Sequence, residues 1–193
     1  TQYLKMDIQT TFEKIGAEFF TSLETLQGKL SRVKAFVFDW DGVLNDGRKG
    51  EGVNSSFSEA DSMGVNLLRF SYFLQHGEQP LTAIITGQRN PSAVYMGKRE
   101  HFHAVYMGYL DKSIAFKEML EQHNLAPTEV AYFFDDVLDA SVAKQCGLRV
   151  LVHRDANPVF QEFLREHDYA DYVTGRRGDN FGIREACELL LAL

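Results

Sequence analysis

The chain has 193 residues, of which 45% are hydrophobic, and its formal net charge is -7 at pH 7. This length is enough for one sizeable hydrophobic core. The negative charge argues against a nucleic-acid backbone as partner, and no apolar run approaches the ~20 residues that a membrane span needs. The first residues lack the basic and apolar regions of a secretory signal. Cys146 and Cys187 lack CxxC spacing, so we expect reduced, buried thiols in a cytoplasmic protein.

Hydrophobic residues near the N-terminus recur at steps of three and four. They are Ile8, Phe12, Ile15, Phe19, Leu23, Leu26 and Leu30. This spacing predicts one amphipathic helix from about Asp7 to about Leu26. We expect residues 1–30 to be a helical extension and residues 31–193 to be the main domain. The apolar stripe of the helix could be a docking or oligomerisation face, but we favour a helix that packs on its own domain.

From Val33 onward, strand patterns alternate with helix patterns. The expected strands are Val33–Asp39, Leu81–Thr86, Ala104–Met107, Val130–Phe134, Leu148–Val152 and Tyr172–Val173. The expected helices are Met63–His76, Pro91–His101, Asp111–His123, Asp139–Cys146 (closed by Gly147 as a C′ glycine), Pro158–Glu166 and Ile183–Leu191. Leu44–Asp61 is rich in Gly, Asn and Ser and is typical of a loop or small hairpin. The alternation predicts an α/β fold with a doubly wound, Rossmann-like parallel sheet flanked by helices.

Polar side chains follow several of these strands directly. The apolar run Phe36–Phe38 ends in two carboxylates, Asp39 and Asp41, and Thr86 ends the next strand. Asp135 and Asp136 follow a later strand, and Lys112 begins the helix after Met107. A parallel sheet brings such residues to one edge, where ligands bind. Carboxylates held together at low dielectric are unfavourable without a cation, so we expect a metal and reaction site there.

This set of side chains suits the hydrolysis of a phosphate monoester. One carboxylate can attack phosphorus and form an aspartyl-phosphate, while a second protonates the leaving oxygen and then activates water. Lys112 supplies a compact positive charge and Thr86 a hydroxyl donor. Mg²⁺ takes oxygen ligands, so it fits Asp39, Asp135 and a backbone carbonyl.

The same segments carry a resemblance to a known family. FDWDGVLNDG, IITG, the lysine of YLDKSIAF and YFFDDVLDA resemble, in order and spacing, the four motifs of the haloacid dehalogenase-type phosphatases. DSMGV, DKSIAFKEML and GRRGDNFGIREACEL resemble the small subfamily that has no large cap domain. That subfamily includes phosphatases of 3-deoxy-D-manno-octulosonate 8-phosphate and of nonulosonate 9-phosphates. The match runs from about Val33 to Leu193.

The resemblance implies a catalytic role for each matching position. Asp39 would be the nucleophile, and Asp41 would be the general acid and base, with its main-chain carbonyl on Mg²⁺. Thr86 would bind the phosphoryl oxygens, and Gly87 would let the backbone approach them. Lys112 would neutralise Asp39 and the phosphate.

The resemblance also implies the metal ligands and the substrate contacts. Asp135 would bind Mg²⁺, as would Asp39 and Asp41, with Asp136 and Asp139 as further ligands or their partners; Asp139 could equally cap the helix after it. Asp61 matches an aspartate in the family's substrate-facing segment. Arg176, Arg177 and Arg184 match a tail region that reaches a neighbouring subunit's active site, although one of the first two could be a surface charge. Relatives of this type are commonly tetramers.

The sequence departs from the family pattern at two places. Phe134 stands where a glycine usually precedes the aspartate pair. A left-handed backbone there would cost phenylalanine ~1–2 kcal/mol, whereas an ordinary strand residue would place its ring near the site. The segment RKGEGVNSSFSEA looks short for the family's hairpin and carries Ser55 and Ser56 where relatives often have lysine.

These observations support three hypotheses about function. The first is a Mg²⁺-dependent phosphomonoesterase that acts on a small phosphorylated sugar acid and assembles as a homo-oligomer, a tetramer. The second is an impaired member that serves as an oligomerisation or regulatory module because Phe134 disturbs the site. The third is a phosphotransferase such as a sugar phosphomutase. The third normally needs a cap domain that excludes water, and the chain has no insertion large enough.

Overall fold

A computed structural model describes residues 7–50 and 55–193. Within these ranges the chain forms a seven-stranded sheet in the order β1-β7-β6-β5-β2-β3-β4. The strands are β1 Glu18–Phe19, β2 Ala35–Phe38, β3 Leu81–Thr86, β4 Ala104–Met107, β5 Val130–Phe134, β6 Leu148–His153 and β7 Tyr172–Arg177. All neighbouring strands are parallel except β1, which runs antiparallel to β7. The predicted α/β class and parallel, doubly wound sheet are therefore confirmed.

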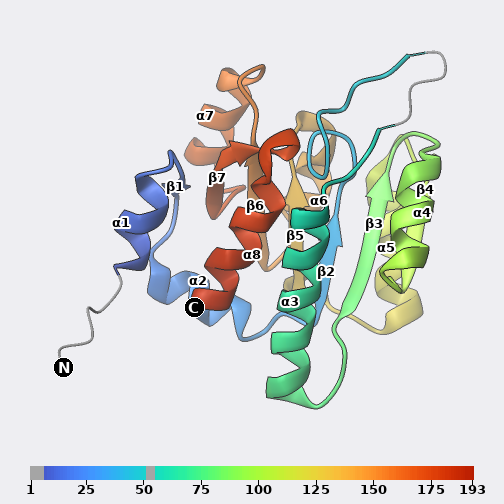
Figure 1. Ribbon diagram of the computed structural model, residues 1–193, viewed down its shortest axis with the longest axis horizontal. Helices are drawn as coiled ribbons and strands as arrows, with labels where there is room; N and C mark the ends of the chain where they lie inside the picture. Colours follow the sequence, from blue (N-terminus) through green and yellow to red (C-terminus); the bar gives the residue numbers. More distant parts are fainter. Residues whose placement is uncertain (1–6, 51–54) are drawn as a thin grey trace.

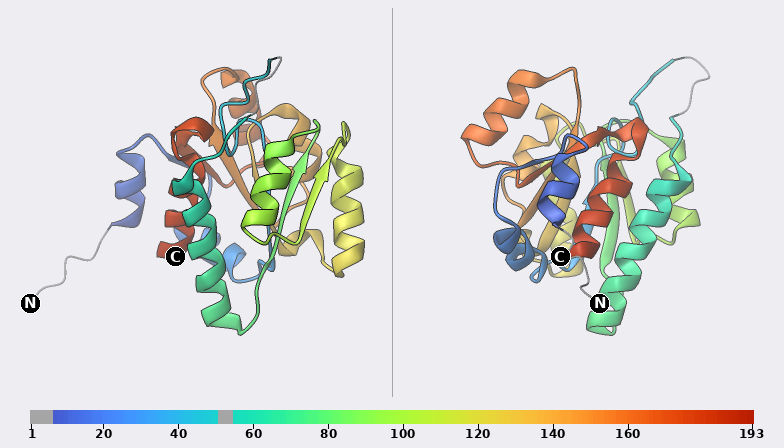
Figure 2. Two further views of the ribbon diagram at one scale, coloured as in Figure 1. Left: turned by 45° about the vertical axis from the view of Figure 1, so that its right-hand side comes forward. Right: turned by 60° about the vertical axis from the view of Figure 1, so that its left-hand side comes forward.

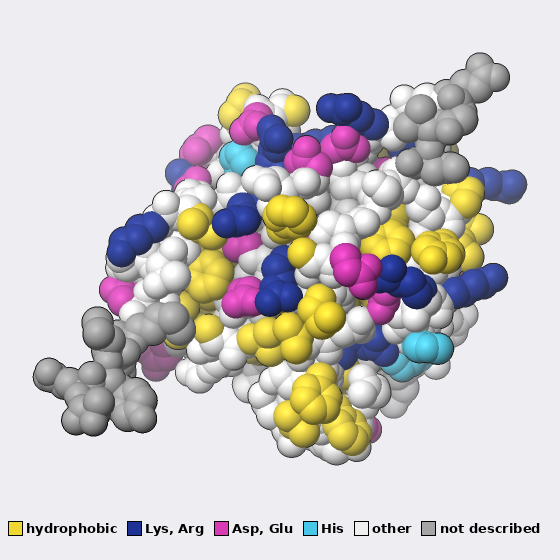
Figure 3. Space-filling model, in the orientation of Figure 1, with side chains coloured by type: hydrophobic (Ala, Val, Ile, Leu, Met, Phe, Trp, Pro, Cys, Tyr) yellow, Lys and Arg dark blue, Asp and Glu magenta, His cyan; other side chains and the backbone are white. Residues whose placement is uncertain are grey.

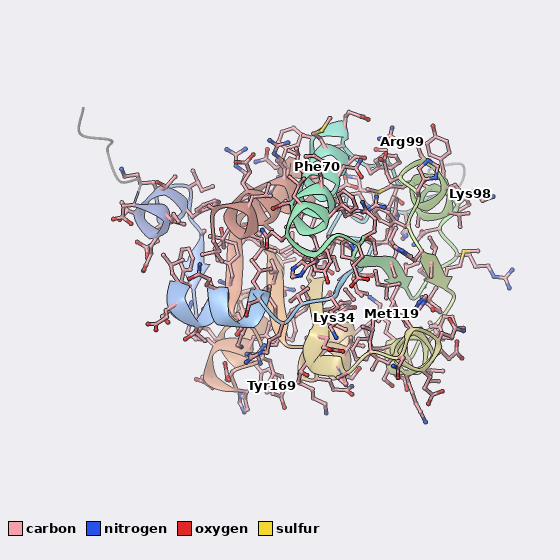
Figure 4. All side chains as sticks on the ribbon, turned by 90° about the horizontal axis from the view of Figure 1, so that it is seen from below. Lys34, Phe70, Lys98, Arg99, Met119 and Tyr169 are labelled. Carbon is pink, nitrogen blue, oxygen red and sulfur yellow. The ribbon has the colours of Figure 1, made fainter. Side chains whose placement is uncertain are left out.

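Helices cover both faces of the sheet (Figures 1 and 2). They are α1 Ile8–Glu13, α2 Leu23–Leu30, α3 Glu59–His76, α4 Pro91–Arg99, α5 Lys112–His123, α6 Ala140–Ala143, α7 Pro158–Glu166 and α8 Gly182–Ala192. Short 3₁₀ turns lie at Pro127–Glu129, Val137–Asp139 and Gly178–Asn180. In the view along the sheet from below, α3 with Phe70 lies on one side and α5 with Met119 on the other (Figure 4).

Alternate residues of the central strands supply two separate cores. Phe36, Phe38 and Phe133 face the side that α3, α4 and α8 cover. Val37 and Tyr132 face the side that α5 and α6 cover. This period of two follows from the strand geometry, and the burial of both sets explains why the strands read as continuous apolar runs.

The loops after the central strands meet at one edge of the sheet. β2 is hydrogen-bonded to both β3 and β5 in parallel register, with Phe38 opposite Ile84 and Phe133. Residues 45–50, which follow β2, project beyond this edge (Figure 1). Since parallel strands end on the same side, the polar residues that follow β2, β3, β5 and β6 share one rim.

The N-terminal segment differs from the single helix that its sequence predicts. α1 ends at Glu13, Gly16 takes a left-handed backbone with φ 93°, and Glu18–Phe19 pairs with β7. A second helix, α2, begins after the capping residue Ser22, whose hydroxyl accepts the Thr25 N–H. The prediction was wrong because hydrogen bonds to the sheet edge outweigh the local helical pattern. The favoured packing on the chain's own domain is confirmed: Phe12 and Leu23 lie against the main core.

The helix after β5 is also shorter than predicted. A 3₁₀ turn precedes α6, which spans only Ala140–Ala143. Gly147 is not a left-handed C′ residue; its N–H instead bonds to the Val130 carbonyl, so the chain has already joined the sheet. A Cβ at Gly147 would lie 2.0 Å from the Thr128 carbonyl oxygen, which explains the need for glycine.

Both cysteines are free and buried, as predicted. Among the residues that the structure describes, no helix combines the length and apolar character that crossing a membrane requires.

Gly175 provides a test of how the N-terminal segment docks. A Cβ at this position would lie 2.2 Å from the Ile15 carbonyl oxygen and 2.7 Å from the Ala17 nitrogen. We expect Gly175→Ala to lower the free energy of unfolding by about 1–3 kcal/mol, because backbone atoms must move apart. Urea denaturation would measure the change.

Gly28→Ala in α2 is the matched control, because no described atom outside the local helix backbone lies within 4 Å of the added Cβ. This substitution should stabilise the protein by about 0.5–1 kcal/mol through helix propensity. A Gly175→Ala protein as stable as the wild type would contradict the docking of this segment on β7.

Candidate active site

Three buried carboxylates converge at the rim after β2 and β5. Oxygen atoms of Asp39, Asp135 and Asp139 lie within 4.8 Å of one another. Asp39 follows β2 directly and donates its N–H to the Phe133 carbonyl, which fixes its position beside the end of β5. Each residue is at most 5% exposed. We call these three residues the acidic triad.

Lys112 is the main counter-charge of the acidic triad. Its Nζ lies 2.6 Å from Oδ1 of Asp39 and 2.6 Å from Oδ1 of Asp139. Asp111 caps α5 by accepting the Ser113 N–H, and this places Lys112 at the first helical position with its side chain buried. Tyr132 donates a further hydrogen bond of 2.6 Å to Asp139. The structure therefore brings together the predicted Asp39 and Lys112.

Burial and neighbouring charges shift the pKa values of Asp39, Asp135 and Lys112. Burial raises the pKa of Asp39 well above its usual value; the charge of Asp139 raises it further, and Lys112 opposes both effects. Burial likewise raises the pKa of Asp135 to about 7, with Asp139 adding to the rise and Arg154 opposing it. Burial by itself lowers the pKa of Lys112, but the Asp39 and Asp139 carboxylates outweigh it, so the net pKa is raised.

The acidic triad offers a donor set that suits a hard divalent cation. All of its side-chain donors are carboxylate oxygens, and oxygen is the preferred donor for Mg²⁺. Only Lys112 and Arg154 form ion pairs with these carboxylates among the described residues. A divalent ion would relieve the repulsion and desolvation that raise the two pKa values. The residues present therefore fit a metal site.

Asp41 lies beside the acidic triad in a second polar group. Its Oδ2 accepts hydrogen bonds from Lys49 at 2.5 Å and from Asn90 at 3.0 Å. Asn90 also donates to Thr86 Oγ1 at 2.9 Å, so the ends of β2 and β3 are linked. Asp41 Oδ1 is buried and has no hydrogen-bond partner among the described residues. An orphaned buried acceptor of this kind is expected where a substrate or ion binds.

Asp136 is not a member of the acidic triad. Its Oδ1 accepts the N–H of Val137 at 2.7 Å and caps the 3₁₀ turn after β5. Asp139 takes the place in the cluster instead, and its side chain does not cap α6. The alternation of a strand end explains the outcome, because successive residues point in opposite directions.

Asp61 supports the helix α8. It is fully buried, and its Oδ1 accepts the N–H of Arg184 at 2.7 Å near the start of α8. Burial raises its pKa to about 6. Arg184 itself pairs with Glu188 one turn later, at 2.5 Å. Arg176 and Arg184 line a groove with residues of α1, and within the described chain they make no contact with the acidic triad. Their predicted substrate contacts remain predictions.

The structure shows the surroundings of two residues that the sequence analysis singled out, Phe134 and Gly87. Phe134 has an ordinary strand backbone, and its ring is buried beside Tyr132 in the core on the α5 side, so the left-handed strain does not arise. At Gly87 a Cβ would make only ordinary contact, 3.5 Å from the Tyr109 carbonyl oxygen. The protein itself therefore does not require glycine at position 87, and its role toward a phosphoryl group stays a prediction.

The sequence reasoning missed three side chains at this rim: Lys49, Asn90 and Arg154. Arg154 follows β6 directly and pairs with Asp135. It could have been found by the same rule that found Asp39, since it is a polar residue at a strand end. Lys49 and Asn90 lie in loops, and no periodic signal marks them. The hairpin prediction for the segment after β2 falls partly on residues 51–54, outside the described residues.

Asp61→Asn tests the buried carboxylate. The folded pKa of about 6 exceeds the reference value of 3.8, so the folded state binds more protons between these values and its stability falls as the pH rises through them. Asparagine keeps the acceptor for the Arg184 N–H and removes the titration. Relative to the wild type, Asp61→Asn should gain up to about 3 kcal/mol of unfolding free energy between pH 4 and pH 8.

Urea denaturation at several pH values measures this difference. Asp7→Asn is the control, because Asp7 caps α1 at the exposed surface. A wild-type to Asp61→Asn difference that is independent of pH would contradict the raised pKa.

The comparisons with known proteins agree with this geometry. No protein-family model matches the chain. The chain is 33% identical over 167 residues to the 3-deoxy-D-manno-octulosonate 8-phosphate phosphatase KdsC of Escherichia coli K12, covering 84% of this chain and 81% of that protein.

Two solved structures have the same fold. The 3-deoxy-D-manno-octulosonate 8-phosphate phosphatase of Yersinia pestis superposes with a TM-score of 0.73 at 29% identity, over 88% of this chain and 86% of the other. The enzyme of that name from Moraxella catarrhalis, solved with magnesium, phosphate and KDO, gives a TM-score of 0.73 at 25% identity, over 89% and 92%. The chain therefore belongs to the haloacid dehalogenase-type phosphatases, in the group without a cap domain that contains these enzymes.

Proposed function

We propose that the protein is a Mg²⁺-dependent phosphomonoesterase that hydrolyses a small phosphorylated sugar acid. The observation that carries the proposal is the buried acidic triad with Lys112 at the carboxyl rim of the sheet. The substrate class is supported by the relatives, which are named as 3-deoxy-D-manno-octulosonate 8-phosphate phosphatases, one of them solved with KDO bound.

In the proposed reaction Asp39 attacks phosphorus and the bond to the sugar oxygen breaks. Asp41 gives its proton to that oxygen, and its carboxylate then takes a proton from the water that hydrolyses the aspartyl-phosphate. Inorganic phosphate and the sugar alcohol are the products. Lys112 holds Asp39 at 2.6 Å and offsets negative charge on the transferring group.

The metal would be held by Asp39 and Asp135, with the main-chain carbonyl of Asp41 as a further donor. The bound ion supplies positive charge for the phosphoryl oxygens. Asp139 holds Lys112 in place at 2.6 Å and completes the acidic triad. Asn90 connects Asp41 to Thr86, which we propose to be a phosphoryl-oxygen donor.

The hypothesis of an impaired module is less well supported. It depended on Phe134, and this ring packs into the core next to Tyr132. The described residues also contain no inserted domain over the rim, which disfavours a mutase that must exclude water. The tetramer, Arg177 at a neighbouring subunit's site, and the separation of residues 1–30 from 31–193 remain proposals.

Asp39→Asn is the direct test of the nucleophile. We expect turnover of p-nitrophenyl phosphate with Mg²⁺ to fall by on the order of 10⁴-fold or more, because an amide cannot attack phosphorus. Asp7→Asn, the same change at an exposed helix cap, should keep wild-type activity. Unchanged turnover in purified, folded Asp39→Asn would exclude the proposed chemistry.

A substrate panel tests the proposed sugar acid. Phosphate release from the 3-deoxy-octulosonate 8-phosphate and nonulosonate 9-phosphate esters should exceed release from neutral sugar phosphates in kcat/KM. A difference of at least about 10-fold is expected, since one charge-assisted contact contributes about that much. Equal kcat/KM values across the panel would indicate a general phosphatase and contradict the proposed substrate class.

A further inference from the structure

Arg154 holds the third carboxylate of the acidic triad. Lys112 contacts Asp39 and Asp139, but the ion pair of Asp135 is with Arg154, whose Nη1 donates to Oδ2. The Asp135 side chain is 2% exposed and that of Arg154 is 30% exposed, so the guanidinium covers the carboxylate from the solvent side. Lys112 and Arg154 together therefore form ion pairs with all three carboxylates.

The backbone after β2 forms a slot for this guanidinium. Gly42 and Gly47 both have left-handed backbones, with φ 84° and 71°. A Cβ at Gly42 would lie 1.9 Å from Asp135 Oδ2 and 2.7 Å from Arg154 Nη1. A Cβ at Gly47 would lie 3.2 Å from Arg154 Nη2. The two glycines therefore let the loop close directly onto the ion pair.

Arg154 also joins this loop to the end of β5. Its Nη2 approaches the Asp46 carbonyl oxygen at 3.5 Å while Nη1 holds Asp135. The loop is ordered internally by Asn45, which donates to the Trp40 carbonyl and accepts the Gly47 N–H. Asp41 lies within this loop. One arginine thus connects the two segments that supply the proposed Asp41 carbonyl and Asp135 carboxylate.

We propose that Arg154 is a positioning residue for the metal site. It engages one oxygen of Asp135, leaves the other for the cation, and holds the loop of Asp41 at the distance that the metal needs. Partners that hydrogen-bond a ligating carboxylate commonly contribute 10–100-fold to metal affinity. The inference rests on the proposed function, because it takes Asp135 to be a Mg²⁺ ligand.

The test is the Mg²⁺ affinity of Arg154→Met, measured by isothermal titration calorimetry on the full chain without substrate. We expect the dissociation constant to rise by about 10–100-fold. The Mg²⁺ concentration for half-maximal p-nitrophenyl phosphate turnover should rise by the same factor, while kcat at saturating Mg²⁺ recovers. The direction of the change in affinity is decisive. Removing a nearby positive charge would by itself relieve Coulomb repulsion and tighten Mg²⁺ binding.

Arg48→Met is the matched control. Arg48 lines the same cleft as Arg154, but it pairs with Asp46 instead of the acidic triad. Its Mg²⁺ affinity should stay close to that of the wild type. Circular dichroism shows whether each variant is folded. If Arg154→Met does not fold, Arg154→Lys is measured in its place, because lysine keeps the charge without the forked geometry. This variant should weaken Mg²⁺ binding by at least about threefold.

Unchanged or tighter Mg²⁺ binding in the folded variant would overturn the inference, and tighter binding would mean that the guanidinium competes with the ion. An equal weakening in Arg48→Met would also overturn it, because the loss of affinity would then not depend on the contact with Asp135. If the wild type itself neither binds Mg²⁺ nor hydrolyses p-nitrophenyl phosphate, the proposed function fails, separately from the role of Arg154.

Discussion

The ion pairs between Lys112 and two buried aspartates organise the rim of this protein. Lys112 lies 2.6 Å from both Asp39 and Asp139, with all three side chains almost fully buried. Charges removed from water at this depth must be compensated locally. The compensation ties the end of β2 to the start of α5 and to the turn after β5, so the position of each carboxylate depends on the others.

A network of neutral and charged donors extends this arrangement to either side. Asn90 joins Asp41 to Thr86 across β2 and β3, and Arg154 joins Asp135 to the loop after β2. The rim is mixed in charge, and the space-filling view shows acidic and basic side chains next to one another along the upper edge of the molecule (Figure 3). A site of this kind can accept a dianionic phosphate only with added positive charge, which agrees with the donor set of the acidic triad.

Two further buried carboxylates, Asp61 and Glu185, stabilise the fold. Asp61 receives the N–H of Arg184 at the start of α8, where the helix dipole favours a carboxylate. Glu185 likewise accepts hydrogen bonds from the Tyr172 hydroxyl and from the N–H groups of Gly175 and Arg176. These contacts attach α8 to α3 and β7, and they explain why carboxylates away from the reaction site are buried at all.

The sequence by itself determined where several strands lie along the chain and which polar residues follow them. The predicted bounds are confirmed for the strands at Leu81–Thr86, Ala104–Met107 and Val130–Phe134. Each is a short apolar run with turn residues at both ends, a pattern typical of a buried strand. The convergence of Asp39, Lys112 and Asp135 followed from the rule that parallel strands end at one edge. Only the tertiary structure decided that Asp139 joins the cluster while Asp136 caps the 3₁₀ turn, that Arg154 holds Asp135, and that the N-terminal stripe breaks at Gly16 to add a strand. Each of these depends on hydrogen bonds and charges between segments far apart in the chain, which no local pattern records.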